Sequence, residues 1–428
     1  MTGVLSAVNI AVIGAGISGL GCAYHLAKRG HRVHIFEARD RIGGHTATYD
    51  VHLGARRFAI DTGFIVYNDR NYPNLVRLFD ELGVTTHDTS MGFSVCDEAT
   101  GLEYAGNSLN TLFAQRGNLL SPSFLGMVRE ILRFNKLAVS DLDAGRLSPD
   151  QTVGDYLSNN GFSDHFARQY LLAMTSAIWS ADAEDALDFP LEFFVRFFRN
   201  HGLLSLKDRP QWRVVDGGSR EYLAPLTQRV ADSIRTRMPV SRILRPPGKP
   251  VVVQFTNGLM REFDEVVIAT HSDEALKMLG DPTDHEKAVL GAMPYRDNEV
   301  ILHTDTRLLP KTQRAWSSWN YRLKPGNGRA TVTYNMNILQ GIDAPETFCV
   351  TLNDTASINP HRILGRFNYA HPQFTLEGMQ AQQRWADING HNGTWFCGAY
   401  WQNGFHEDGL ASGLRVAESL CSARQMAA

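Results

Sequence analysis

The chain has 428 residues, 43% hydrophobic and 20% charged, which is enough for two or three folded domains and excludes a disordered chain. Its 42 Lys and Arg residues against 45 Asp and Glu residues give a net charge of −3, without the basic surplus of a nucleic-acid-binding protein. Five cysteines without a C-x-x-C pair argue against a disulfide scaffold and a common zinc site, so we expect no metal and a cytoplasmic location.

The first predicted elements form a β-α-β unit. The apolar run Ile10–Ile13 is typical of a buried parallel strand, and residues 20–27 have the apolar spacing of a helix that stops at Gly30. A second strand is expected at Val33–Phe36. Between strand and helix, Gly14–Gly19 reads G-A-G-I-S-G and matches the G-x-G-x-x-G pattern of dinucleotide-binding loops.

Each conserved position of this pattern has a physical role in binding a dinucleotide. Gly14 permits the tight turn, Gly16 lets backbone approach a diphosphate, and Gly19 lets the helix pack closely on the strand. The helix N-terminus favours the negative charge of the diphosphate. Glu37, directly after the second strand, can accept hydrogen bonds from ribose hydroxyls, and its carboxylate would repel the 2′-phosphate of NADP.

The next residues favour a flavin cofactor. Residues 37–48 read E-A-R-D-R-I-G-G-H-T-A-T and resemble the R-x-G-G-x-x-x-[S/T] extension of FAD enzymes in the amine oxidase, protoporphyrinogen oxidase and phytoene desaturase superfamily. In that family, the glycines bring backbone close to the diphosphate and the arginine adds charge. His45 stands where a second arginine is common. The resemblance implies an α/β fold, in which a Rossmann-like FAD-binding domain of the glutathione-reductase type carries an inserted, amine-oxidase-like α+β substrate domain.

Further segments resemble the superfamily in the same order along the chain. Residues 61–64 resemble the segment that passes the isoalloxazine ring, and 215–219 form a Gly-Gly turn before a helix. Strands at 240–244, 251–255 and 264–270 resemble the return to the sheet. A strand at 394–399, the motif 404–413 and an apolar helix from Leu414 resemble the last FAD-binding motif, in which a helix N-terminus points at the flavin.

The resemblance implies FAD held without a covalent bond, since no cysteine aligns with an attachment position. The residues that it implies for FAD binding are Gly14, Gly16, Ser18, Gly19, Glu37, Arg39, Gly43, Gly44, His45, Thr62, Gly63, Val240, Gly398, Glu407, Asp408 and Gly409. Glu407 and Asp408 have an alternative role as ordinary caps of a helix N-terminus.

Three separated blocks are predicted to build the FAD-binding domain, and two insertions the substrate domain. The FAD-binding blocks are 1–75, 205–290 and 390–428, and the insertions are 76–204 and 291–389. The first insertion reads as mainly helical, with helices expected at 124–137 and 189–198. The second reads as strands at 299–303, 329–334 and 347–352.

Two departures from the superfamily argue against amine oxidation. Amine oxidases keep a lysine near the flavin on a strand that matches Asn298–His303, and this stretch has no lysine. They also clamp the amine between two aromatic rings. One ring of that pair matches Phe405, and Tyr369 is our choice for the other.

The insertions suit an apolar substrate better. They contain the large side chains Phe189, Phe193, Phe194, Phe197, Phe198, Trp316, Trp319 and Tyr321. An acyl chain needs a long apolar wall, and Arg196 and Arg199 beside these residues would meet a phosphate or carboxylate head group. The same stripe is more often core packing, and an amphipathic helix at a membrane surface is a further alternative. Because no apolar run reaches the roughly 18 residues of a membrane span, we expect peripheral contact at most, at the inner face of the membrane.

His406 is the polar residue that we expect beside the flavin, where it would move a proton or form a hydrogen bond. Tyr400 and Asn320 are further candidates for catalysis, and His371 is a weaker one. For each of them a structural role is the alternative.

At closer range the chain resembles a bacterial subgroup of predicted FAD-binding proteins often encoded beside cyclopropane-fatty-acyl-phospholipid synthase homologues. The signatures lie at 61–68, 208–212 and 404–409. The sequence therefore predicts an FAD-dependent oxidoreductase that desaturates or isomerises a small apolar molecule or fatty-acyl lipid. A flavin-dependent amine oxidase and a non-catalytic partner of a lipid-modifying enzyme are the alternatives. The electron acceptor and the oligomeric state stay open.

Overall fold

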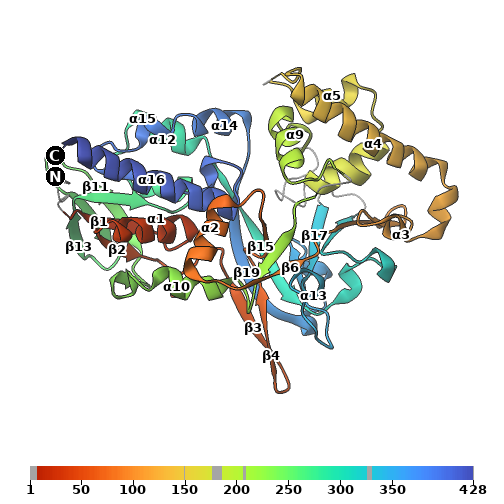
Figure 1. Ribbon diagram of the computed structural model, residues 1–428, viewed down its shortest axis with the longest axis horizontal. Helices are drawn as coiled ribbons and strands as arrows, with labels where there is room; N and C mark the ends of the chain where they lie inside the picture. The colour runs from red at the N-terminus through yellow and green to blue at the C-terminus, as the bar shows by residue number, and fades with distance from the viewer. Residues whose placement is uncertain (1–6, 149, 176–185, 206–208, 325–329, 428) are drawn as a thin grey trace.

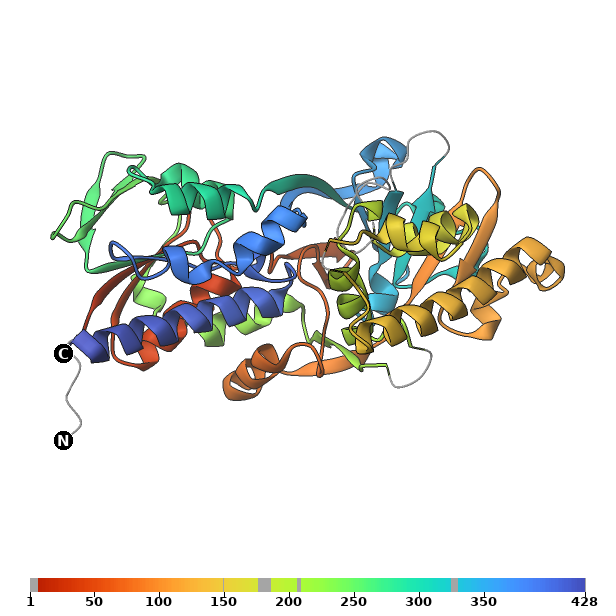
Figure 2. The same ribbon diagram turned by 90° about the horizontal axis from the view of Figure 1, so that it is seen from above.

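Two lobes lie side by side along the long axis of the molecule, each with its own hydrophobic core (Figures 1 and 2). The computed structural model describes residues 7–148, 150–175, 186–205, 209–324 and 330–427. Asp208 and Arg329, which belong to a predicted signature and a predicted strand, lie outside the described residues.

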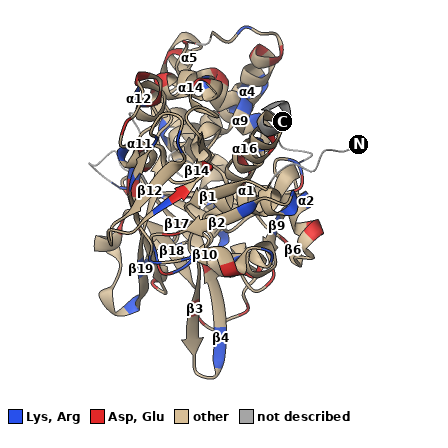
Figure 3. Ribbon diagram, turned by 90° about the vertical axis from the view of Figure 1, so that its left-hand side faces the viewer, with Lys and Arg blue, Asp and Glu red and all other residues tan. Residues whose placement is uncertain are grey.

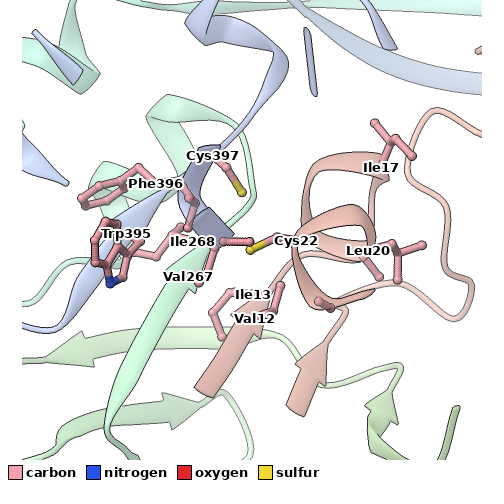
Figure 4. Packing of buried hydrophobic residues seen from close by; sticks show 14 of the residues in the cluster. Val12, Ile13, Ile17, Leu20, Cys22, Val267, Ile268, Trp395, Phe396 and Cys397 are labelled. Atoms are coloured by element: carbon pink, nitrogen blue, oxygen red, sulfur yellow. The ribbon is translucent and has the colours of Figure 1, made fainter. Parts of the chain in front are cut away.

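A five-stranded parallel sheet organises the first lobe, in the order β10-β2-β1-β14-β20. Its strands are β1 (Asn9–Ile13), β2 (Arg32–Phe36), β10 (Ile234–Arg235), β14 (Glu265–Ile268) and β20 (Thr394–Phe396). Their apolar side chains are buried, as the unbroken apolar runs predict. Helix α1 (Ile17–Lys28) packs on this sheet, and Figure 4 shows its Cys22 pointing toward Val267 and Ile268. The predicted β-α-β unit and the return strand are therefore confirmed.

Helix α16 (His406–Ala427) lies against α1 along most of its length (Figure 2). The close approach requires glycine, because a Cβ at Gly413 would collide with the carbonyl oxygen of Ser18. The sequence predicts an apolar helix only from Leu414, whereas the helix begins at His406. The motif 406–409 therefore forms its first turn, capped by a hydrogen bond from Phe405 N to Asp408 Oδ2 of 2.8 Å.

Smaller elements complete the first lobe. They are α2 (Pro73–Leu82), α10 (Leu223–Thr227), α11 (Ser272–Met278), α12 (Asp284–Gly291), α14 (Leu376–Gln382), α15 (Trp385–Ile388), the antiparallel strands β11 (Val240–Leu244), β12 (Val251–Phe255) and β13 (Met260–Phe263), and the small sheet of β5 (Tyr67–Asn68), β6 (Thr86–Thr89) and β9 (Trp212–Val215). Viewed from the side of the parallel sheet, basic and acidic positions are interspersed (Figure 3).

A seven-stranded sheet organises the second lobe, in the order β19-β15-β18-β17-β16-β7-β8. Its strands are β7 (Phe93–Asp97), β8 (Leu102–Ala105), β15 (Tyr295–His303), β16 (Trp319–Leu323), β17 (Ala330–Asn335), β18 (Cys349–Leu352) and β19 (Ile363–Pro372). The strands predicted in the second insertion are present. The first insertion, expected to be mainly helical, also adds β7 and β8, because β7 pairs in parallel with β16.

The helices of the second lobe pack their aromatic side chains together. They are α3 (Leu109–Leu112), the 3₁₀ helix η1 (Arg116–Leu120), α4 (Pro122–Asp143), α5 (Val153–Asn159), α6 (Asp164–Phe166), α9 (Leu191–Asn200) and α13 (Met336–Leu339). Phe134 of α4 lies 5.6 Å from Phe166 and 6.4 Å from Phe194 between ring centroids. Most of the aromatic stripe at 189–198 is therefore core packing. No helix among the described residues is both long and apolar enough to span a membrane.

The division between the two cores corrects the predicted domain boundaries at three places. The hairpin β3 (Thr48–Leu53) and β4 (Arg56–Asp61) contributes Val51, Phe58 and Ile60 to the core of the second lobe. Conversely, all of α2, together with α14 and α15, packs in the core of the first lobe. Long-range contacts of short amphipathic elements decide these memberships, and sequence position alone does not reveal them.

Candidate functional site

The candidate site lies at the carboxyl ends of the parallel strands. Gly14 follows β1, Glu37 follows β2, His271 follows β14 by three residues, and Gly398 follows β20. Loops that leave the same edge of a parallel sheet converge, which makes this edge the usual ligand site of such folds. The residues predicted from the first forty-five positions and from the last motif therefore come together here.

The glycine loop has the geometry that a bound diphosphate requires. Gly14 has φ +103°, and a Cβ on Gly19 would collide with the carbonyl oxygen of Gly14. A Cβ on Gly16, by contrast, would meet only the Cα of Gly44, at 4.0 Å. Gly16 thus faces space, while Gly14 and Gly19 are required by the fold itself.

The first turn of α1 leaves its backbone N–H groups available to an anion. No side chain caps this helix, and its first turn contains no acidic residue. Ser18 is buried in that turn and packs toward Gly409 of α16. Uncapped N–H groups beside an open glycine fit a negatively charged diphosphate.

The carboxylate of Glu37 is held in place by backbone hydrogen bonds, one of them from the glycine loop itself. Its Oε2 accepts a hydrogen bond from Ala15 N at 2.9 Å, and its Oε1 accepts one from Arg39 N at 2.9 Å. Met238 N donates to the carbonyl oxygen of Glu37 at 2.9 Å, which brings the start of β11, and so Val240, toward the same corner. This placement is consistent with the prediction that Glu37 and Val240 contact the adenosine end of FAD.

A second glycine turn, at Gly43 and Gly44, packs against the glycine loop at Gly14–Gly19. Gly43 N donates to Ala15 O at 2.7 Å, and a Cβ on Gly44 would lie 3.1 Å from the Cα of Gly16. The guanidinium group of Arg41 donates to the carbonyl oxygens of Thr46 at 3.1 Å and Gly44 at 2.9 Å. Arg39 is exposed, and its predicted contact with FAD stays a prediction. Arg41 therefore fixes the turn.

Four histidines gather where the two lobes meet. His45 follows the second glycine turn, and its ring lies 5.6 Å from His371 and 6.3 Å from His271. His406 begins α16 and stacks on Phe64 with ring centroids 3.8 Å apart. The Nε2 atom of His45 is buried and has no hydrogen-bond partner in the described part of the chain. An unpartnered buried imidazole nitrogen at this position fits a polar ligand group that the protein alone does not provide.

The hydrogen bonds of His371 determine its tautomer. Asn298 accepts from Asn353 Nδ2 through Oδ1 at 2.8 Å, and its Nδ2 donates to Arg296 O at 3.2 Å. The same Nδ2 lies 3.3 Å from His371 Nδ1, which must therefore accept. Nε2 of His371 then carries the proton and is a donor.

His406 belongs to a chain of side-chain hydrogen bonds. Its Nε2 lies 2.8 Å from the hydroxyl of Tyr222, which in turn bonds to the hydroxyl of Thr46 beside His45. On the other side of His45, the hydroxyl of Thr62 lies 2.9 Å from that of Tyr369. Both chains join loops of the first lobe, and the second reaches β19.

All four histidines are held neutral. Burial lowers the pKa of His371 to about 4 and that of His406 to about 3. Burial also lowers the pKa of His45 and His271, and the other histidines add to the shift at His45. Neutral imidazoles can donate or accept a proton without a fixed charge. Among the described residues no group of His, Cys, Asp and Glu side chains could hold a metal ion.

The last motif uses its two acidic residues within the protein. Glu407 accepts hydrogen bonds from Asn74 N at 3.0 Å and Leu75 N at 2.9 Å, so it caps α2. Asp408 caps its own helix, and burial raises its pKa to about 7. The expected helix capping is thus present, although Glu407 caps a neighbouring helix. An FAD contact for either residue stays a prediction.

Tyr400 and Gly398 lie beneath this motif. A Cβ on Gly398 would collide with the Tyr400 ring, which is buried and 5.3 Å from that of Trp401. Burial raises the pKa of the Tyr400 hydroxyl far above its usual value. These contacts give Tyr400 a packing role in the turn after β20, and a catalytic role stays a prediction.

Asn320 does not join the histidines. Its side-chain oxygen accepts from Ser94 Oγ at 2.8 Å and Ser317 N at 3.0 Å, and its amide donates to Ser317 O and Thr333 O. Every polar atom of its amide therefore serves the second-lobe sheet, which corrects its prediction as a catalytic residue.

The two arginines predicted to meet a lipid head group lie on the outer face of α9, and that role stays a prediction. Arg196 forms an ion pair with Glu192, and Arg199 forms one with Asp143. Both are largely exposed, because they lie on the face of α9 opposite its buried phenylalanines.

A buried carboxylate joins two of the predicted segments. Asp61 accepts hydrogen bonds from Ser219 N at 2.9 Å and Gln340 Nε2 at 2.9 Å. An open pocket of about 690 Å³ adjoins this network. It is lined by Arg57, Phe58, Ala59, Gly83, Val84, Thr85, His87, Val215, Asp216, Gly217, Gly218, Glu221, Pro225, Gln340 and Ile342, and by none of the residues predicted to bind FAD.

A comparison with protein families matches residues 17–421 to the family of flavin containing amine oxidoreductases. The chain belongs to this family. It is 24% identical over 337 residues to AofH of Mycobacterium tuberculosis, which is assigned as a flavin-containing monoamine oxidase; the match covers 76% of this chain and 68% of AofH. It is 36% identical to 15-cis-phytoene desaturase of Synechococcus elongatus over 77 residues, which are 18% of this chain and 15% of that enzyme.

Solved structures confirm the amine-oxidase-like fold. Cyclohexylamine oxidase from Brevibacterium oxydans superposes with a TM-score of 0.69 at 17% identity, covering 98% of this chain and 100% of that chain. The CLA-producing fatty acid isomerase from P. acnes superposes with a TM-score of 0.67 at 16% identity, covering 97% and 98%. As a member of the flavin containing amine oxidoreductase family, the protein is an FAD-dependent oxidoreductase. The open glycine loop, the uncapped helix and the orphaned His45 nitrogen fit that cofactor.

Three residues that the structure places at this site were not predicted from the sequence. Arg41 belongs to the R-x-G-G pattern, and its position there is the signal that distinguishes it from Arg39. His271 lies three residues beyond a strand that parallels β1, a position where side chains reach the ligand edge. Tyr222 gives no signal in sequence, since only the folded turn brings its hydroxyl to His406.

Proposed function

We propose that this flavoenzyme acts on an apolar acyl chain, which it desaturates or isomerises by hydride transfer to FAD. The proposal rests mainly on one feature of the structure: the aromatic face of α9 contacts Phe374, just after the strand that carries His371, and Phe405, just before the helix that begins at His406. The resemblance to the bacterial subgroup encoded beside lipid-modifying enzymes supports it.

Two ring stacks form this contact. Phe197 stacks on Phe405, the residue before His406, with centroids 5.2 Å apart. Phe193 stacks on Phe374, three residues after His371, with centroids 5.5 Å apart. The rings provide an apolar wall without polar atoms, which suits a chain of methylene groups. Phe193, Phe374 and Phe405 are half-buried, whereas the rest of the stripe belongs to the core.

The chemistry divides between cofactor and protein. Bound FAD supplies an acceptor for a hydride, that is, for two electrons and one proton of a C–H bond. Desaturation also releases a second proton from the neighbouring carbon, and the electrons of that C–H bond form the C=C bond. In an isomerisation the hydride returns at another carbon, so no external acceptor is consumed. In a desaturation, oxygen, a quinone or a protein must take the electrons.

We assign the proton to the histidine cluster. His371 is neutral, its Nδ1 accepts from Asn298 and its Nε2 carries the proton, so it can donate a hydrogen bond to the substrate but cannot take the released proton. We therefore assign the released proton to His406, whose ring is oriented by Tyr222. The half-buried rings of Phe193, Phe374 and Phe405 would hold the chain and exclude water from both histidines.

Amine oxidation is the second candidate function, because AofH and cyclohexylamine oxidase are similar to this chain. Against it stands β15, which has no lysine between Asn298 and His303. The Asn298 amide is instead committed to Asn353, Arg296 O and His371.

Anaerobic mixing of the FAD-loaded protein with candidate substrates tests the proposal. Acyl phospholipids or fatty acids should bleach the visible flavin band if they are desaturated, and should be recovered with a moved double bond and no lasting bleaching if they are isomerised. Primary amines should leave the band unchanged. His406→Asn should slow either reaction by about 100-fold, the usual scale of a lost acid–base group. His361→Asn, an exposed histidine outside the cluster, is the matched control. Bleaching by amines alone would favour the second candidate. No bleaching by either class, together with unchanged acyl chains in the recovered lipids, would favour a non-catalytic partner.

A further inference from the structure

Exposed leucines are concentrated in one segment of the second lobe. Among the described residues, eight large hydrophobic side chains are exposed, and five of them lie between positions 109 and 132. They are Leu109, Leu119, Leu120, Leu125 and Leu132, exposed by 77%, 50%, 88%, 39% and 47%. They belong to α3, to η1 and to α4, which η1 directly precedes. Exposed apolar side chains are normal when scattered, whereas such a local concentration indicates an interaction surface.

The outer face of α4 combines leucines with basic residues. Leu125, Arg129, Leu132 and Lys136 are spaced at four, three and four residues, so they share one face of the helix. All four are exposed, whereas Phe124, Met127, Phe134 and Ala138 on the opposite face are buried. Arg129 and Lys136 form no ion pair with any described residue.

The charge of this segment differs in sign from that of the chain. Residues 106–140 contain four basic residues and one acidic residue, whereas the whole chain has a net charge of −3. The acidic residue, Glu130, is occupied by hydrogen bonds from Ser163 N at 2.8 Å and Ser163 Oγ at 2.5 Å. The exposed leucines are therefore accompanied by an excess of basic over acidic residues.

We infer that α4 and the η1 turn before it dock on a bilayer that contains anionic phospholipids. Leucines that enter the boundary between head groups and acyl chains, flanked by Arg and Lys that meet lipid phosphates, are the features of an interfacial helix. A protein partner would explain less directly why exposed leucines alternate with basic side chains on the same face of α4. The inference is independent of the proposed reaction, because docking requires no turnover.

The position of the surface gives docking a consequence. The inner face of α4 packs on α9 through Phe134 and Phe194. Helix α9 in turn contacts Phe374 and Phe405, which lie beside His371 and His406 in the chain. Docking through α4 therefore places the bilayer one helix away from the aromatic wall. In Figures 1 and 2, α4 lies in the lobe remote from the chain termini.

Co-sedimentation with vesicles tests the inference. The full-length, FAD-loaded protein should bind vesicles of phosphatidylcholine mixed with phosphatidylglycerol, and bind those of phosphatidylcholine alone more weakly. The triple variant Leu120→Ser, Leu125→Ser, Leu132→Ser should bind at least about tenfold more weakly. Arg129→Gln with Lys136→Gln should lose about tenfold and lose the salt dependence of binding. Because all these side chains are exposed, each variant should keep the melting temperature of the parent.

The control is Leu259→Ser with Met260→Ser, two exposed apolar residues in the first lobe. This variant should bind like the parent. Absence of binding to anionic vesicles, equal binding by the triple variant, or an equal loss in the control would each overturn the inference. A dimer of the parent that the leucine substitutions dissociate in sedimentation velocity would also overturn it, because a second copy would then cover the surface.

Discussion

Gly16 is a glycine that the fold does not require but that a bound cofactor would. A side chain at Gly14 or Gly19 would collide with the protein's own backbone, whereas one at Gly16 would meet only the Cα of Gly44 at the edge of contact distance. The free space at Gly16 is what the FAD diphosphate needs, so this position tests cofactor binding without testing folding.

Gly16→Val should fold normally and purify without FAD, because its methyl groups occupy the diphosphate position. Circular dichroism and the melting temperature of the apoprotein test the fold, and the flavin absorbance per protein tests loading. Gly106→Val, at an exposed turn where nothing lies within 4 Å of a Cβ, should stay fully loaded. A yellow, fully loaded Gly16→Val protein would refute the assignment of this loop.

Single residues of the site were predictable where a local pattern fixes the backbone. Gly14, Gly19 and Gly43 each meet a steric limit that the motif encodes, and the structure shows those limits. His271 and Tyr222 were not predicted, because their positions depend on β14 and on a turn that folds against a distant loop. Side-chain networks of this kind leave no periodic trace in the sequence.

At the level of elements, the N-terminus of α2 depends on a contact with α16. Glu407 provides the acceptor for the first N–H groups of α2, and its carboxylate is buried. The N-terminus of α2 follows the segment 61–68, which passes the predicted flavin position. The carboxylate therefore links the last motif to that segment.

Glu407→Ala should lower the free energy of unfolding by about 2 kcal/mol, the scale of a charged helix cap that is lost while its donors stay buried. Glu407→Gln keeps one acceptor oxygen and should lose less. Chemical denaturation at neutral pH measures both, with the exposed Glu418→Ala on the same helix as control. Equal stability of Glu407→Ala and Glu418→Ala would show that the contact with α2 contributes nothing.

Elements with strong periodicity were predicted well, and those with mixed character were not. The β-α-β unit and α4 follow from long apolar patterns. The start of α16 was placed too late because Gly404–Gly413 reads as a loop, although Asp408 at the third helical position is an N-terminal signal. The stripe of α9 has two correct interpretations, since Phe194 and Phe198 are core while Phe193 and Phe197 also reach the site loops.

At the scale of the whole molecule, each lobe has its own part in the proposed reaction. The first lobe would hold FAD at the carboxyl edge of its parallel sheet. The second lobe would supply the aromatic side chains of α9 that contact the residues beside the histidines. The fold and the cofactor follow from the family. The proteins that resemble this chain include a cyclohexylamine oxidase, a 15-cis-phytoene desaturase and a fatty acid isomerase, so the resemblance does not fix the substrate. The substrate depends on the wall and on the residues that replace the amine oxidase lysine.

Mass spectrometry of lipids incubated with the FAD-loaded protein and an electron acceptor tests this account most directly. The account predicts acyl chains that are two hydrogen atoms lighter, or chains of unchanged mass whose double bond has moved, and no change with the Gly16→Val protein. Unchanged lipids, together with conversion of primary amines to aldehydes and peroxide, would contradict it.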